Sequence, residues 1–76
     1  MEYSYCVVES TYRLDDKSYT AYGIACVTSE DDSIIVLATY DDLSTDLAKV
    51  SHLVKLCNEL KLDIIHLPDV VDDFIA

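Results

Sequence analysis

The chain divides into two halves with different residue periodicity, and this division limits the folds that its 76 residues can form. Residues 3–40 contain clusters of β-branched and aromatic residues, which are typical of strands. Residues 45–75 place apolar side chains at intervals of three and four, which is typical of amphipathic helices. A chain of this length supports one hydrophobic core. We therefore predict a single α+β domain over residues 1–76, in which a three-stranded antiparallel β-meander (3–40) precedes two helices (45–75) packed on one sheet face.

Two acidic turns separate the three expected strands, which span residues 3–14, 18–28 and 33–40. We prefer a three-residue loop at 15–17, which places Cys6 opposite Cys26. A two-residue loop stays open and would exchange the faces of the strands, because no Asn-Gly or Asp-Gly pair specifies the turn. A four-residue loop at 29–32 then pairs Cys26 with Ile35.

The second half of the chain carries helix start signals at two places. Ser44 and Thr45 are cap candidates, and Asp46 follows where the helix dipole favours a negative charge. The side of this first helix that we expect to face the sheet consists of Leu47, Val50, Leu53, Val54, Cys57 and Leu60. Pro68 suits the first position of a second helix. A helix of about nine residues needs docking for its stability, and Phe74 is its expected anchor.

The charge of the chain argues against some classes of partner. The chain has 15 acidic and 5 basic residues, which gives a net charge of −10. Such a field repels phosphate backbones and anionic lipid head groups, so we expect no nucleic-acid binding and no membrane association. The longest apolar run, residues 34–38, is too short to cross a bilayer, and the first residues lack the features of a signal peptide. A cytoplasmic location is expected.

The residues that usually carry chemistry form no recognisable site. Cys6, Cys26 and Cys57 match no zinc spacing and are expected to be free, buried thiols. His52 falls on the polar side of the first helix, and His66 precedes the second helix, where we expect a structural role. The acidic runs lack EF-hand spacing, and hydrolase and phosphate-loop motifs are absent. We therefore predict no catalytic residue, no metal ligand and no cofactor.

Tyrosines are unusually frequent in the strand half, where the chain has all 6 of them, against 1 Phe and no Trp in total. With the three-residue loop, the sheet face that the helices leave bare carries Val7 and the four candidate interface residues Tyr3, Tyr5, Arg13 and Tyr19. Tyrosine suits both a pleated sheet surface and a protein interface, so both interpretations stay open. A homodimer through this face or through an edge strand is a hypothesis that these residues suggest.

Four stretches of the chain resemble a known family. They are Tyr22-Gly23-Ile24, Asp42-Leu43-Ser44-Thr45-Asp46, Leu56-Cys57-Asn58-Glu59 and His66-Leu67-Pro68-Asp69-Val70-Val71-Asp72-Asp73-Phe74. The chain is similar to small uncharacterised proteins of anaerobic Gram-positive bacteria, classed as a domain of unknown function. The resemblance implies a single-domain, cytoplasmic bacterial protein. It supplies no activity, substrate, cofactor or catalytic residue.

The function that these observations favour is a small cytosolic, non-catalytic protein-binding or regulatory module with an unknown protein partner. Two alternatives from other classes stay open. One is a small enzyme or metal-dependent site around His66 and Cys57. The other is an acidic decoy that imitates nucleic acid and occupies a nucleic-acid-binding protein, which the net charge alone suggests.

Overall fold

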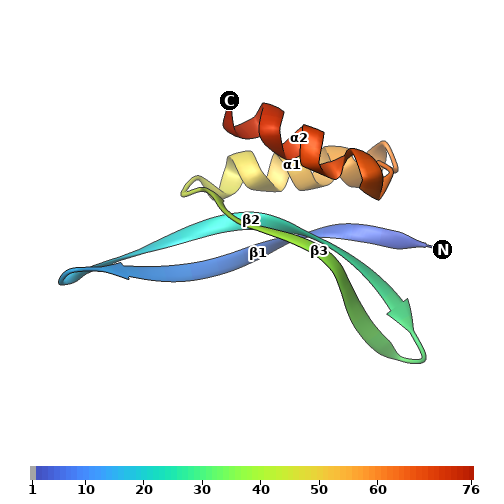
Figure 1. The fold of residues 1–76 in the computed structure, drawn as a ribbon, viewed down its shortest axis with the longest axis horizontal. Helices are drawn as coiled ribbons and strands as arrows, with labels where there is room; N and C mark the ends of the chain where they lie inside the picture. Colours follow the sequence, from blue (N-terminus) through green and yellow to red (C-terminus); the bar gives the residue numbers. More distant parts are fainter. Residues whose placement is uncertain (1) are drawn as a thin grey trace.

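The computed structural model describes residues 2–76 and confirms the predicted α+β fold. In chain order the elements are β1 (Tyr3–Leu14), β2 (Lys17–Glu30), β3 (Ser33–Ser44), α1 (Leu47–Glu59), the 3₁₀-helix η1 (Ile64–His66) and α2 (Leu67–Ile75). The strands form one antiparallel sheet in the order β1-β2-β3. Figure 1 shows both α-helices on the same side of this sheet, so its other face carries no helix.

The loop between β1 and β2 is one residue shorter than the loop that we preferred. Asp15 and Asp16 alone form it, so the two-residue alternative is correct and the three-residue prediction was wrong. Asp15 has a φ of 56°, in the left-handed region that Asp adopts more readily than most residues. Tyr5, instead of Cys6, therefore lies opposite Cys26. Because successive residues point to opposite faces, this one-residue shift exchanges the faces of β1 relative to β2.

The loop between β2 and β3 is also shorter than predicted. It consists of Asp31 and Asp32, with φ values of 50° and 65°. Two successive positive φ values are what a type I′ hairpin requires, and this turn matches the twist of the strands. The predicted pairing of Cys26 with Ile35 was wrong, since Cys26 lies opposite Ala38. The acidic turns thus lie where we predicted them, but both are tighter.

The pairing of β2 with β3 is irregular at two places. The register shifts between Tyr22 and Ile24, and again between Cys26 and Val27. Gly23 lies at the first shift, where the backbone of β3 passes so close that a Cβ atom would come within 2.9 Å of the Asp41 Cα. A glycine inside a strand commonly marks such a close backbone approach. β3 itself continues to residue 44, beyond its predicted end at residue 40.

The N-cap of α1 is Asp46, which lies one residue after Thr45 and two after Ser44, the predicted cap positions. The Asp46 carboxylate caps it by accepting hydrogen bonds of 3.0 and 3.3 Å from two backbone N–H groups of the first turn. The Ser44 hydroxyl instead accepts a hydrogen bond of 3.0 Å from the Asp46 N–H. Thr45 has no part in the cap. Val50, Val54 and Cys57 are the buried residues of α1, whereas the predicted sheet-facing set also included residues that are largely exposed, namely Leu47 and Leu60.

α2 closes the core that lies between the helices and the sheet. Pro68 lies in its first turn, as predicted. Leu67 and Val71 are the buried residues of α2, and Leu67 has no exposed surface. Phe74 packs against the core but is only half-buried, so Leu67 is the main anchor of α2 in place of Phe74. No helix within the described range has the length and apolar character of a membrane span.

Candidate interaction surface

The sheet face away from the helices, which we call the uncovered face, is made by alternate residues of the strands (Figure 1). Tyr5, Ile24 and Cys26 belong to the core, so their sequence neighbours point to the other side. The uncovered face comprises the even-numbered residues of β1 from Ser4 to Leu14, the odd-numbered residues of β2 from Lys17 to Ser29, and Ile34, Val36 and Thr39. The β1 and β2 positions of this face carry no acidic residue, since the two acidic residues of these strands, Glu9 and Glu30, belong to the opposite pleat.

Large apolar side chains are exposed at both ends of the uncovered face. Near the loop between β2 and β3, the exposed fractions of Ile34 and Val36 are 74% and 58%. Near the loop between β1 and β2, Leu14 is 69% exposed, and the ring of Tyr19 stacks on that of Tyr12 with their centroids 5.3 Å apart. The part of β2 between these ends contributes alanine and glycine. Groups of exposed apolar side chains commonly mark interaction sites.

The four residues predicted at an interface do not share one face. Tyr3 and Tyr5 were wrongly placed on the bare face: Tyr5 is buried in the core and Tyr3 packs against it. Arg13 was also placed on the wrong face, because it points to the same side of the sheet as Tyr5. It is exposed, since the β1–β2 hairpin extends beyond the helices (Figure 1). Tyr19 lies on the uncovered face, as predicted. The one-residue shift in the β1–β2 register separates these residues.

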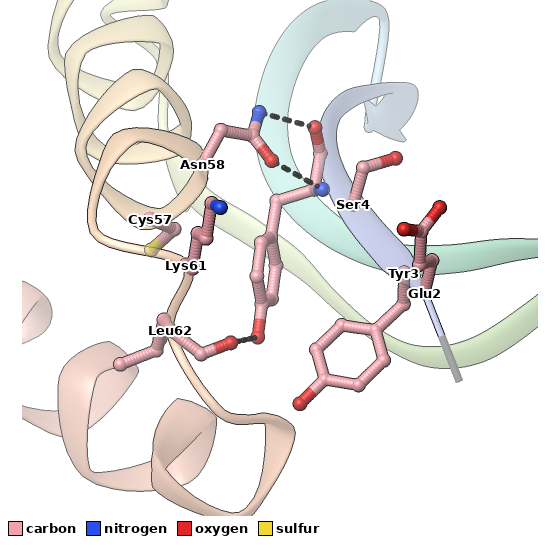
Figure 2. A pocket seen from close by; sticks show the side chains of 8 residues that line it. Glu2, Tyr3, Ser4, Cys57, Asn58, Lys61 and Leu62 are labelled. Carbon is pink, nitrogen blue, oxygen red and sulfur yellow. Dashed lines mark hydrogen bonds between the residues drawn. The ribbon is translucent and has the colours of Figure 1, made fainter.

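Asn58, near the end of α1, covers a short part of the outer edge of β1 (Figure 2). Its Oδ1 accepts a hydrogen bond of 2.8 Å from the Tyr5 N–H, and its Nδ2 donates one of 2.9 Å to the Tyr5 carbonyl oxygen. The side-chain amide thus forms the pair of bonds that a neighbouring strand would form. Sequence reasoning does not single out Asn58, because its position on the helix resembles that of any solvent-exposed polar residue.

The hydroxyls of two tyrosines tie β1 to the segment after α1. The Tyr5 hydroxyl donates to the Leu62 carbonyl oxygen at 2.7 Å, and the Tyr3 hydroxyl accepts from the Ile64 N–H at 2.9 Å. Burial raises the pKa of the Tyr5 hydroxyl, which therefore keeps the proton that it donates. A hollow of about 550 Å³ lies beside these bonds, lined by residues 2–5, Cys57, Asn58, Lys61 and Leu62 (Figure 2). The phenol oxygens and the Asn58 amide in its lining are engaged in the fold.

We expect Asn58→Ala to lower the free energy of unfolding by about 1 to 3 kcal/mol, because the part-buried N–H and C=O groups of Tyr5 at the outer edge of β1 lose their partners. Urea denaturation followed by circular dichroism measures this change. Ser51→Ala is the matched control, because Ser51 is an exposed polar residue of the same helix, and it should change stability by less than about 0.5 kcal/mol. Equal stability of the two variants would show that the hydrogen bonds between Asn58 and Tyr5 do not stabilise the fold.

The cysteines and histidines do not form a reactive group. Burial raises the pKa of the Cys57 thiol and of the Cys26 thiol, although a hydrogen bond with Tyr5 lowers the latter in part. A protonated thiol is a poor nucleophile and a poor metal ligand. Cys57 is buried on the sheet side of α1, whereas His66 is exposed at the start of α2. Within residues 2–76, no three His, Cys, Asp or Glu side chains converge as metal ligands would.

Comparisons with known proteins agree with the resemblance of the chain to a domain of unknown function. The search among curated proteins found no match, and the search among solved structures found none either. A family model described as a family of unknown function (DUF6514) matches residues 1–76, which is the entire sequence. The chain therefore belongs to the family of unknown function DUF6514.

Proposed function

We propose that the chain is a non-catalytic protein-binding or regulatory module and that the uncovered face is its binding surface. The observation that carries this proposal is the distribution of charge. A chain with a net charge of −10 has no acidic residue at the β1 and β2 positions of this face, while Ile34 and Val36 are exposed there. A surface that contacted only water would be expected to share in the acidic charge.

The chemistry of the uncovered face specifies the kind of partner. Aliphatic side chains at one end and the stacked Tyr12 and Tyr19 rings at the other suit an apolar protein surface. Aromatic residues are enriched at protein interfaces, where they bury much area at little entropic cost. The net negative charge disfavours nucleic acid and anionic membranes as partners. We place the module in the bacterial cytoplasm, where its three free cysteines stay reduced.

Site-specific photocross-linking in the producing cells tests this proposal. A photoreactive amino acid replaces Val36 on the uncovered face or, as the control, Ser51 on the exposed side of α1. We expect a discrete adduct with a different protein from position 36 and none from position 51. Adducts from position 51 alone, or none from position 36 at any cell density, would contradict the proposal.

A pair of charge variants separates the uncovered face from general surface effects. Ile34→Lys places a charge on the uncovered face, and Leu60→Lys does the same on the helix side, where the residue has the same exposed fraction of 74%. We expect Ile34→Lys to abolish the adduct from position 36 and Leu60→Lys to leave it intact. Circular dichroism checks that both variants keep the fold. An adduct that survives Ile34→Lys would overturn the assignment of this face.

A further inference from the structure

The two edge strands of the sheet differ in how well they are protected. The strand order leaves one side of β1 and one side of β3 without a neighbour. An edge strand presents unpaired N–H and C=O groups, and soluble proteins protect such edges with bulges, charges, prolines or cover. β3 has two register irregularities, and it carries Asp41 and Asp42, the latter with a φ of 54°. A strand distorted in this way is a poor template for pairing.

The edge of β1 is long and lacks bulges and prolines, and its only charged residues are Glu9 and Arg13. Its pairing with β2 is regular from Tyr3 to Leu14, and the strand has no lysine or proline. Asn58 covers this edge only at Tyr5. Tyr5 directs its N–H and C=O groups away from β2, and the alternation of an antiparallel ladder gives the same outward direction to Val7, Glu9, Thr11 and Arg13. Figure 1 shows that the far part of the β1–β2 hairpin extends beyond the helices.

We propose that this edge binds β1 of a second copy of the chain, antiparallel, with the two-fold axis at Thr11. Thr11 then pairs with Thr11 of the second copy, and Glu9 lies opposite Arg13 of the second copy. Symmetry repeats this ion pair on the other side of the axis. Opposite charges placed directly across an antiparallel pair stabilise it. Among residues 2–76 the only ion pair within the chain joins Lys55 and Glu59, so Glu9 and Arg13 are both available.

Neighbouring registers are less favourable for identifiable reasons. With the axis at Ser10, Asp15 of the second copy would lie opposite Tyr5, whose outward groups Asn58 already holds. With the axis at Tyr12, Asp15 of the second copy would lie opposite Glu9, and like charges directly across a pair are destabilising. With the axis at Thr11, the second copy's β1 ends opposite Val8 and does not reach Tyr5, whose edge groups Asn58 binds. The hydrogen bonds of Asn58 and the charges thus favour the same register.

Edge pairing leaves the proposed binding surface free and enlarges it. The two sheets become one six-stranded sheet, and Val8 on the uncovered face of one copy lies beside Leu14 of the other. This contact covers part of an exposed apolar side chain, since Leu14 is 69% exposed in the single chain. The inference goes beyond the proposed function and does not depend on it, because pairing uses the edge of β1 and not the uncovered face.

The oligomeric state of the purified full chain provides the first test. Sedimentation equilibrium from micromolar to millimolar concentration is expected to show a monomer–dimer equilibrium. Thr11→Pro removes an outward N–H at the axis without removing a bond to β2, so this variant should keep its circular dichroism spectrum and lose the dimer. A parent chain that stays monomeric, or a dimer that survives Thr11→Pro, would overturn the proposal.

Charge reversal provides a second test that does not depend on proline. Glu9→Arg and Arg13→Glu each replace two attractive pairs by two repulsive pairs, so each variant should dimerise about tenfold more weakly than the parent. An equimolar mixture of the two should recover parent-like dimerisation, because both pairs across the mixed interface are then Arg with Glu. Equal dimerisation of the separate variants and their mixture would refute the register. The photocross-linking at position 36 is scored independently, so either proposal can fail alone.

Discussion

Gly23→Ala is expected to lower the free energy of unfolding by about 3 kcal/mol or more, because the added Cβ overlaps backbone rather than flexible side chains. A Cβ at this position would collide with the Tyr40 carbonyl oxygen and approach the Asp41 Cα to 2.9 Å. Both atoms belong to β3, whose pairing with β2 already shifts at Gly23. Relief of the overlap requires the two strands to separate. A domain of this size has on the order of 5 to 10 kcal/mol of stability in total.

Thermal and urea unfolding of the Gly23→Ala variant, followed by circular dichroism, measure this effect. Ser33→Thr is the control, because it also adds a methyl group to a strand residue, but at an exposed position. We expect the control to unfold within about 0.5 kcal/mol of the parent. If Gly23→Ala were as stable as Ser33→Thr, the close approach of β2 and β3 would be wrong.

Leu67→Ala is expected to cost about 2 to 5 kcal/mol, because it removes a fully buried side chain and leaves a cavity. Leu67 begins α2, which has only 9 residues and is too short to be stable without docking. Loss of this contact should therefore also release α2. We expect a lower urea midpoint and faster amide hydrogen exchange in residues 67–75 than in α1.

Ile65→Ala is the matched control for Leu67→Ala. Ile65 lies two residues earlier, in η1, and 72% of its surface is exposed. Its truncation removes a similar volume from an exposed position, so the expected change in stability is below about 1 kcal/mol. Comparable losses in the two variants would show that burial of Leu67 does not anchor α2. Phe74→Ala should fall between them, because Phe74 is half-buried.

The local features of this fold can be predicted from the sequence because they depend on local physics. The strand and helix periodicities of the two halves identify the elements, and the acidic pairs at 15–16 and 31–32 identify the turns. Pro68 identifies the start of α2 to within one residue. Turn length could not be predicted in this way, because it depends on whether Asp15 and Asp31 adopt positive φ values.

The candidate surfaces could not be predicted without the strand register, which only the structure provides. A shift of one residue between β1 and β2 moved Tyr5 into the core while Tyr19 remained on the uncovered face. The role of Asn58 depends on a contact between residues 53 positions apart in the chain, which no local pattern encodes. The regular edge of β1 and the irregular edge of β3 likewise could be told apart only from the register shifts of the structure.

The sequence by itself thus determined the order and type of the elements, the acidity and the lack of a recognisable catalytic motif, because these follow from composition and short-range periodicity. The tertiary structure decided which strand face the helices cover, which residue anchors α2, and which edge of the sheet is open. These properties depend on strand register and on contacts between distant residues. A two-residue turn and a three-residue turn have nearly the same local sequence, yet they place opposite faces of β1 against the core.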